Sequence, residues 1–160
     1  MIRFIAALDS KRGIANEQGI PWQGKIPADV KYYHQKIKGA ATIMGYGMYT
    51  ELSKPLVNPT NFVASQRGVK LRDGFLLVED ATEFLQKTQE DVWVLGGAAL
   101  FASTLDLADE LYLTQLHADF DCTKFFPIFQ PGFTLVQKGA DLTQNGITFH
   151  FEVWKRIKRA

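Results

Sequence analysis

Short apolar runs rich in β-formers alternate along this chain with stretches of helical periodicity. The runs predict strands at Ile2–Leu8, Ala41–Met44, Asn61–Ser65, Phe75–Val78, Val92–Leu95, Glu110–Leu116, Thr134–Lys138 and Thr148–Lys155. Apolar residues three or four positions apart predict helices at Pro27–Ile37, Met48–Leu52, Ala81–Thr88 and Ala98–Leu105. Because helices separate most of the strands, we expect an α/β protein with a largely parallel sheet, to which the last two strands add an antiparallel edge.

The composition is that of a globular protein and argues against several kinds of partner. The chain has 160 residues, 46% of them hydrophobic and 22% charged, which suffices for one sizeable core. We therefore expect a single domain over residues 1–160. The formal net charge of +1 creates no field that would attract nucleic acid or an anionic membrane, so we expect neither as a partner.

Cysteine and histidine are sparse. A lone Cys122 cannot form an internal disulfide, which favours a reducing compartment. His34, His117 and His150 are widely dispersed and match no zinc spacing, so we expect no metal site. The apolar N-terminal run is too short for a signal peptide or a membrane span, and we expect a cytoplasmic protein.

One acid stands at the start of an amphipathic helix, directly after an aromatic loop that contains Trp22. Pro27 suits the first helical position, and Asp29 lies where a negative charge favours the helix N-terminus. Tyr33 follows Asp29 by one turn and shares its face. Two interpretations are open at this point: Asp29 complements the helix dipole, or it takes part in chemistry.

Glycines open helices at two strand ends. Val92–Leu95 leads into Gly96-Gly97 and the next helix, and the strand ending at Met44 leads into Gly45 in the same way. Glycine lets a ligand approach the backbone, and a helix start favours an anion, so the two openings together could flank a pyrophosphate. Each opening alone is also compatible with a tight turn, and neither matches the Rossmann or P-loop fingerprint.

Together these motifs resemble dihydrofolate reductases over nearly the whole chain. The resemblance is collinear and rests on Ile5-Ala6-Ala7, Gly13-Ile14, Pro21-Trp22, Pro27-Ala28-Asp29, Ile43-Met44-Gly45, Pro55-Leu56, Gly96-Gly97, Ala108-Asp109-Glu110-Leu111-Tyr112-Leu113-Thr114 and Phe126-Pro127. It implies a single-domain dihydrofolate-reductase-like fold with a mostly parallel eight-stranded sheet and flanking helices. It also implies a reaction, in which hydride passes from NADPH to the pterin ring of 7,8-dihydrofolate to give tetrahydrofolate.

The resemblance assigns roles to particular residues. It implies that Asp29 orients the pterin and favours its protonation, and that Trp22 and Thr114 complete a water-mediated network around it. The implied substrate-binding set is Ile5, Ala6, Asp29, Val30, Tyr33, Leu56, Leu95 and Thr114. The implied cofactor-binding set is Ala7, Ile14, Ile20, Gly45, Tyr46, Gly47, Met48, Ser65, Gln66, Arg67, Gly96, Gly97, Ala98, Ala99, Leu100 and Phe101.

The segment Asp9–Gly24 resembles the family's mobile lid over the nicotinamide, with Ile14 and Ile20 as apolar contacts. Ala15 replaces a glycine of the family pattern, and Gly24-Lys25 resemble a two-residue insertion. We expect both changes to affect lid closure.

Other departures concern specificity. Pro59 stands where relatives commonly carry an arginine for the folate carboxylate, and Lys54 and His34 are the nearest substitutes. On the cofactor side Tyr46 replaces a basic residue, so Arg67 would supply the charge for the 2′-phosphate of NADPH. Two other functions stay open: a reductase of another pterin or a flavin precursor, and an inert pterin- or nucleotide-binding module. The resemblance favours a monomer.

Overall fold

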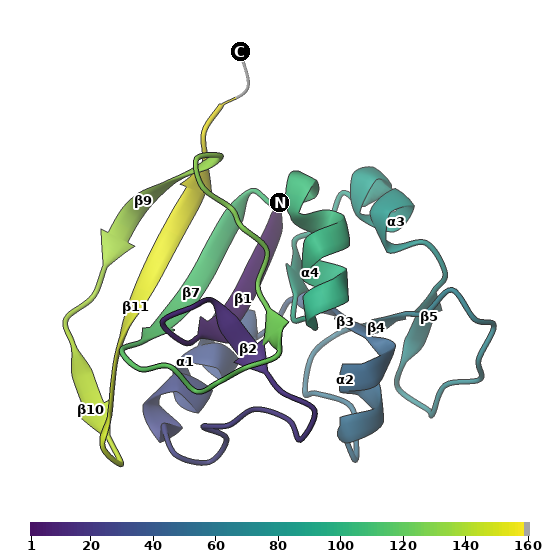
Figure 1. Cartoon of the computed structure of the whole chain (residues 1–160). Coiled ribbons are helices and arrows are strands. Elements are labelled where there is room, and N and C mark those ends of the chain that lie inside the picture. The colour runs from purple at the N-terminus through teal and green to yellow at the C-terminus, as the bar shows by residue number, and fades with distance from the viewer. Residues whose placement is uncertain (159–160) are drawn as a thin grey trace.

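The structure is a computed structural model that describes residues 1–158 (Figure 1). Its strands are β1 (Ile2–Leu8), β2 (Gly13–Ala15), β3 (Ala41–Gly45), β4 (Asn61–Ala64), β5 (Leu76–Val78), β6 (Val92–Val94), β7 (Glu110–Leu116), β8 (Lys124–Phe125), β9 (Phe133–Lys138), β10 (Leu142–Gln144) and β11 (Ile147–Arg156). Its helices are α1 (Pro27–Ile37), α2 (Tyr46–Glu51), α3 (Ala81–Lys87), α4 (Ala98–Thr104) and the 3₁₀ helix η1 (Leu105–Leu107). Residues 159 and 160 of the expected domain lie outside the described part.

The main sheet has the predicted mixture of strand directions. Neighbouring strands follow the order β10-β11-β7-β1-β6-β3-β4-β5, and β9 also pairs with β11. From β7 to β5 all neighbours are parallel, whereas β11 runs antiparallel to β7, β9 and β10. The expected largely parallel sheet with an antiparallel C-terminal edge is therefore confirmed.

The predicted strand count was one too low. Residues 1–158 form a nine-stranded sheet, in which all eight predicted strands occur and β10 is the ninth. This three-residue strand pairs with β11 across a tight turn in which Asn145 and Gly146 both have positive φ. An Asn-Gly pair is the strongest short signal for such a hairpin, and the alternation of apolar residues alone did not reveal it. A second, two-stranded sheet joins β2 to β8.

One helix begins earlier than expected. The helix predicted at Met48–Leu52 starts at Tyr46, and its N-cap is Gly45. Gly47 hides this start in the sequence, because glycine disfavours a helix interior.

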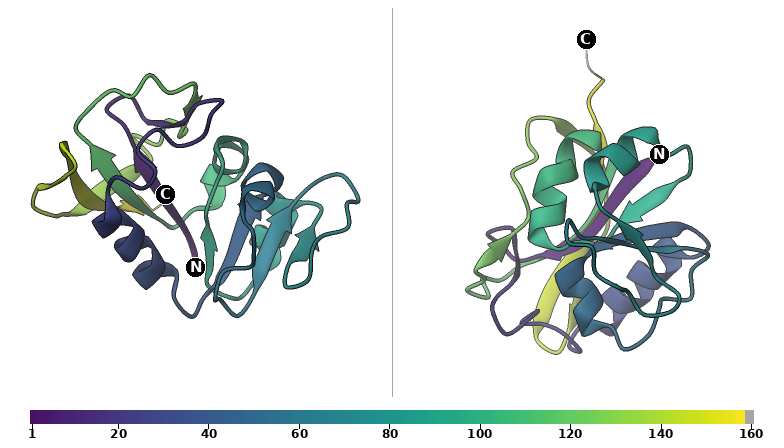
Figure 2. Two further views of the ribbon diagram at one scale, coloured as in Figure 1. Left: turned by 90° about the horizontal axis from the view of Figure 1, so that it is seen from below. Right: turned by 90° about the vertical axis from the view of Figure 1, so that its right-hand side faces the viewer.

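Helices cover both faces of the sheet (Figures 1 and 2). Alternate residues of β1 enter different cores: Phe4 packs with Leu100 and Phe101 of α4, whereas Ile5 packs with Ile37 of α1. The sheet therefore separates a core beneath α3 and α4 from a core beneath α1 and α2. Within residues 1–158, no helix is both long enough and apolar enough to cross a membrane.

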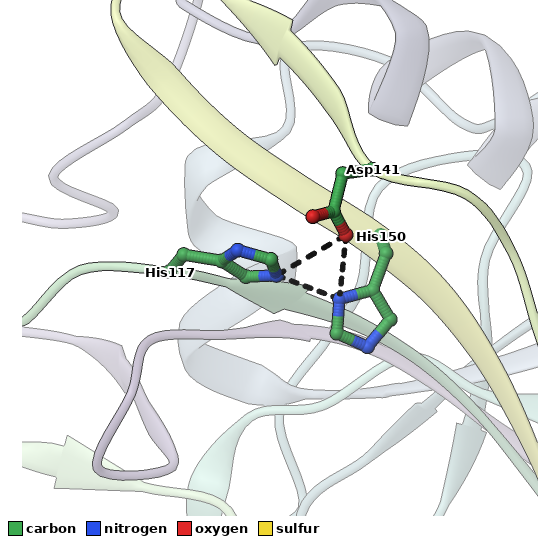
Figure 3. A group of neighbouring side chains, drawn as sticks. All are labelled: His117, Asp141 and His150. Atoms are coloured by element: carbon green, nitrogen blue, oxygen red, sulfur yellow. Dashed lines mark hydrogen bonds and ion pairs between the residues drawn. The ribbon is translucent and has the colours of Figure 1, made fainter.

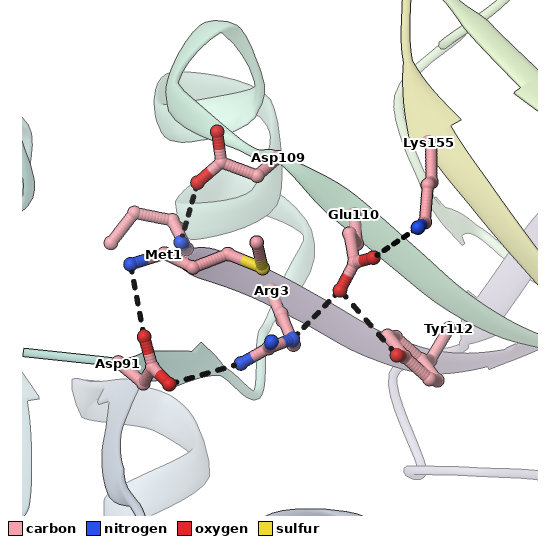
Figure 4. A network of polar contacts seen from close by, with 8 residues as sticks. Met1, Arg3, Asp91, Asp109, Glu110, Tyr112 and Lys155 are labelled. Carbon is pink, nitrogen blue, oxygen red and sulfur yellow. Dashed lines mark hydrogen bonds and ion pairs between the residues drawn. The ribbon is translucent and has the colours of Figure 1, made fainter.

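The two edges of the parallel strands differ in character. At their amino ends, the terminal amine and Arg3 pair with Asp91, and Arg3 also pairs with Glu110 at 2.7 Å (Figure 4). At their carboxyl ends, β1, β3, β4 and β6 lead into the segments that the sequence resemblance assigns to the cofactor. The carboxyl edge is thus the place where ligands bind in open α/β sheets.

Candidate active site

Asp29 lies in the first turn of α1 and faces Thr114 of β7. The Thr114 hydroxyl donates a hydrogen bond of 2.6 Å to Asp29 Oδ1. Burial raises the pKa of Asp29, and the bond from Thr114 opposes that rise only in part. Helix α1 and strand β7 thus bring together the acid and the hydroxyl that the sequence resemblance placed in one network.

The start of α1 is fixed by a distant hairpin. Gln144 accepts a 2.9 Å hydrogen bond from the Ala28 backbone N–H, and Asn145 donates a 2.6 Å bond to the Lys25 carbonyl. These contacts satisfy a backbone N–H in the first turn of α1 and hold the turn that contains Gly24 and Lys25. Sequence reasoning missed Gln144, since the hairpin that delivers it was not predicted.

The proposed walls of the substrate pocket fall into two groups. Ile5 and Leu95 are buried in the core beneath α1 and α2, and Tyr33 and Leu56 pack against it. Ala6 is half-buried and packs on the opposite core. Val30 is 49% exposed, so its place is at the rim rather than in the interior.

Tyr33 carries an unusual hydroxyl. Among the described residues, its buried oxygen is the one buried side-chain polar atom without a hydrogen-bond partner. Burial raises the pKa of Tyr33, with a smaller contribution from the negative charge of Asp29. Because an unpaired buried polar group costs stability, this hydroxyl is a candidate ligand contact.

Trp22 is almost fully buried, with 3% of its surface exposed, and packs edge-on against Phe120. It belongs to a third apolar cluster, in which Ala7 is a partly buried neighbour. This packing holds the indole against the end of β1 and the loop after β7.

The two glycine junctions meet at the carboxyl edge. The Gly45 N–H donates a 2.7 Å hydrogen bond to the Gly96 carbonyl, so the starts of α2 and α4 are adjacent. A Cβ at Gly97 would meet no atom within 4 Å, whereas one at Gly96 would lie 3.0 Å from the Phe101 ring. The protein's own packing leaves the backbone at Gly97 accessible, which fits the close approach of a dinucleotide.

The other proposed cofactor residues vary in exposure. Ile14 is half-buried on β2, and Ile20 is 45% exposed. Leu100 and Phe101 are buried in the core beneath α4, so their side chains are not free to contact a ligand. The remaining members are exposed or half-buried at the strand ends, namely Tyr46, Gly47, Met48, Ser65, Gln66, Arg67, Ala98 and Ala99.

The expected lid segment is tied down at its base. Asp9 is buried and accepts backbone hydrogen bonds from Lys11, Gly13 and Phe120. A Cβ at Gly13 would lie 2.4 Å from that of Cys122, which explains the glycine. Burial raises the pKa of the Cys122 thiol to about 11.

Thr123 connects the lid segment to the loop after β7. Its hydroxyl donates a 2.8 Å hydrogen bond to Glu17, and its backbone N–H donates to the Ala15 carbonyl at 3.0 Å. Thr123 therefore holds the lid segment and the loop after β7 together through two hydrogen bonds.

A groove of about 480 Å³ lies beside Leu56 and is lined by two lysines and a histidine. Both substitutes suggested for the missing arginine, His34 and Lys54, line it, and so does Lys38, which sequence reasoning overlooked. Pro59 is exposed and does not line the groove. The spacing of His34 and Lys38 by one helical turn was the signal available for Lys38.

The expectation that the histidines are too dispersed to act together is wrong for two of them. His117 Nε2 and His150 Nδ1 are 2.7 Å apart, and Asp141 lies beside both (Figure 3). The antiparallel register of β7 and β11 creates this proximity, which spacing along the chain does not show.

Comparison with known proteins agrees with this geometry. The family model for dihydrofolate reductase matches residues 1–156. The chain belongs to the dihydrofolate reductase family. A dihydrofolate reductase of Haemophilus influenzae is 34% identical over 129 residues, which cover 78% of this chain and 77% of that protein.

A solved structure and a longer protein are also similar to this dihydrofolate reductase family member. A solved dihydrofolate reductase from Enterococcus faecalis, complexed with NADP(H) and RAB-propyl, superposes with a TM-score of 0.86 at 24% identity, covering 99% of this chain and 97% of its own. Segregation and condensation protein A of Mycoplasmoides gallisepticum is 32% identical over 160 residues and 98% of this chain. The chain spans only 26% of the length of that protein.

Proposed function

We propose that Asp29 binds and orients the pterin ring in the NADPH-dependent reduction of 7,8-dihydrofolate to tetrahydrofolate. The observation that carries this proposal is a partly buried carboxylate with a raised pKa, which accepts a hydrogen bond from Thr114. Within residues 1–158, Asp29 forms no ion pair. Family membership supports the reaction, and the environment of Asp29 supports its role.

The carboxylate has acceptor capacity left for a ligand. Oδ1 accepts from Thr114, so Oδ2 and the remaining lone pairs of Asp29 can accept from the amino group and a ring N–H of a pterin. A carboxylate there favours the protonated form of the ring nitrogen that gains a proton from water. Thr114 and Trp22 keep the acid and its surroundings in place.

The apolar residues around Asp29 exclude water from the charged contact. We assign this function to Ile5, Leu95, Tyr33 and Leu56, which share one apolar core. An apolar wall strengthens the hydrogen bonds of the carboxylate because water does not compete for them. Val30, which is 49% exposed, would form the rim of the pocket, whereas the Ala6 side chain packs on the opposite core and would contribute only its backbone.

The carboxyl edge of the sheet would hold the dinucleotide, and bound NADPH supplies the hydride. Gly97, whose surroundings are open, would let the cofactor approach the backbone, and the hydrogen bond from Gly45 to Gly96 holds the two helix starts side by side. Arg67 is exposed, and its backbone N–H donates a 3.3 Å hydrogen bond to the Ser65 hydroxyl. The Arg67 guanidinium would pair with the 2′-phosphate of NADPH. Lid residues Ile14 and Ile20 would cover the nicotinamide.

We assign the tail of the substrate to the groove beside Leu56. A carboxylate there would meet Lys54, Lys38 or His34 in place of the missing arginine. The exposed Pro59 offers no donor, and this observation favours one second candidate, a reductase of a dihydropterin without a glutamate tail.

The test follows the loss of NADPH absorbance with dihydrofolate and with a dihydropterin that lacks glutamate. We expect turnover of dihydrofolate, and in Lys54→Ala a roughly ten- to hundredfold lower kcat/KM for that substrate alone, the worth of one charge-assisted hydrogen bond. Lys87→Ala is the control, because Lys87 pairs with Glu83 on α3.

Each other outcome has a defined meaning. Turnover of the tail-less dihydropterin alone would establish the second candidate. Pterin binding without NADPH oxidation would identify an inert binding module and contradict the proposal.

We also propose that residues 1–160 act as one domain and as a monomer in the cytoplasm, without nucleic acid as a partner. The near-neutral net charge of +1 and the single cysteine support this proposal. Sedimentation of the purified protein would test the monomer directly.

A further inference from the structure

We propose that His117, Asp141 and His150 form a binding site for a divalent transition-metal ion of the Zn²⁺ class. His117 follows the end of β7, Asp141 precedes β10, and His150 lies on β11 (Figure 3). Each contributes one ligand atom, and these atoms all lie within 4.8 Å of one another. Two imidazole nitrogens and a carboxylate oxygen are the donor set of many zinc sites that keep open positions for water.

The three donor atoms lie close enough together to share one ion. His117 Nε2 and His150 Nδ1 are 2.7 Å apart, and each is 3.8 Å from Asp141 Oδ1. A point equidistant from the corners of this triangle lies about 2.0 Å from each, which matches zinc–nitrogen and zinc–oxygen bond lengths. The two imidazole nitrogens are now at hydrogen-bond distance, and a tetrahedral ion would need them about 3.3 Å apart, so the exposed His117 ring would have to move outward by roughly half an ångström.

A buried carboxylate orients the central ligand. His150 Nε2 lies 2.7 Å from Glu152 Oε2, and the other oxygen of Glu152 accepts from Gln115 and Trp154. With the Nε2 proton donated to Glu152, the Nδ1 lone pair of His150 points to the cluster. A carboxylate behind a ligating histidine is a recurrent feature of metal sites, since it fixes the tautomer and increases ligand basicity.

Solvent reaches the site from one side. The His150 side chain is only 9% exposed, whereas the His117 and Asp141 side chains are 36% and 61% exposed. An ion would therefore have a rigid ligand on the sheet, two ligands that can adjust, and open positions for water. This arrangement suits Zn²⁺, and imidazole with carboxylate also suits Co²⁺ and Ni²⁺.

The proposed metal site and the proposed catalytic acid lie on opposite faces of the sheet. Thr114 of β7 faces Asp29, and the next residue, Gln115, is paired in register with His150. Because side chains alternate along a strand, His150 points away from the pterin pocket. The site is therefore independent of the proposed reductase function, and its test needs no activity assay.

The test is calorimetric titration of the purified, tag-free chain with Zn²⁺, repeated with Co²⁺ as an optical probe. We expect one ion per chain and at least tenfold weaker binding in His117→Asn and in Asp141→Asn. Both changes are at exposed positions, so folding should survive, and circular dichroism would verify this. His34→Asn is the matched control, because His34 lies on α1 away from the cluster.

Any of three results would overturn the proposal. One is the absence of Zn²⁺ binding by the wild-type chain. Another is equal affinity in the wild-type, His117→Asn and Asp141→Asn proteins, which would place the ion elsewhere. Loss of binding in His34→Asn to the same extent would also contradict it.

Discussion

Two carboxylates meet strand β7 near its two ends, and they are held in opposite ways. At the amino end, Glu110 is 7% exposed and pairs with Arg3 at 2.7 Å and Lys155 at 3.6 Å (Figure 4). Toward the carboxyl end, Asp29 receives the neutral hydroxyl of Thr114. One acid is neutralised by the protein itself, while the other is presented without a cation among the described residues.

The difference agrees with a structural role for Glu110 and with the proposed functional role of Asp29. Charges removed from water destabilise a fold unless partners compensate them, and Glu110 has its partners within the chain. Burial raises the pKa of Asp29, which is the sign of incomplete compensation. This environment of Asp29 supports the proposal that the acid binds a ligand that completes its hydrogen bonds.

Asp29→Asn should have the largest effect on activity. The amide keeps the shape of the side chain but loses the charge that orients the pterin and favours its protonation. We expect kcat/KM for dihydrofolate to fall by about 10²- to 10⁴-fold, the usual contribution of positioned acid–base groups. Steady-state kinetics would measure this, and a variant with more than a tenth of wild-type kcat/KM would refute the role of Asp29.

Thr114→Val should have the next largest effect. The change removes the 2.6 Å hydrogen bond to Asp29, and a bond to a charged group is worth about 1.5–3 kcal/mol. We expect kcat/KM to fall roughly ten- to hundredfold. Since this bond lowers the pKa of Asp29, its loss should move the Asp29-dependent limb of the pH–rate profile to higher pH. An unchanged profile would mean that Thr114 does not influence the acid.

Glu110→Gln should change stability rather than activity. The variant leaves Arg3 and Lys155 without their shared anion at a mostly buried position. We expect the free energy of unfolding to fall by about 1–3 kcal/mol. Urea denaturation would measure that loss, and kcat/KM should stay at the wild-type value. A large loss of activity would show that the amino edge of the sheet contributes to catalysis.

Tyr33→Phe should have the smallest effect, and it should stabilise the protein rather than destabilise it. It removes a buried hydroxyl that lacks a partner, so we expect the free energy of unfolding to rise by about 1 kcal/mol. Thermal unfolding without ligands would detect the change. If the variant also binds dihydrofolate more weakly, the Tyr33 hydroxyl contacts the substrate. A loss of stability would instead show that this hydroxyl has a hydrogen-bond partner in the folded protein.

Sequence patterns sufficed for the elements that carry their own signal. Val30, Tyr33 and Ile37 gave the periodicity of α1, and its predicted bounds, Pro27–Ile37, are confirmed. The family motifs brought Asp29 and Thr114 into one site, although 85 positions separate them. The spacing of apolar residues thus predicted the helix, and the resemblance to a known family predicted that the two side chains meet.

The contacts that the sequence did not reveal depend on strand register. Gln144 reaches Ala28 across 116 positions because the turn at Asn145 and Gly146 sets the pairing of β10 with β11. His117 and His150 meet because β7 and β11 are antiparallel neighbours. Register is decided by turn geometry and by core packing on both faces, neither of which a hydrophobicity pattern specifies.

The most direct test compares the unfolding of Asp29→Asn with that of the wild-type chain. The native pKa of Asp29 is raised, so the folded state takes up a proton before the unfolded state does as the pH falls. We predict that Asp29→Asn is at least as stable as the wild type at neutral pH. This advantage should disappear as the pH falls through the raised pKa toward the ordinary value of 3.8. A loss of stability at neutral pH, like that expected for Glu110→Gln, would show that Asp29 is a structural acid and would contradict the account.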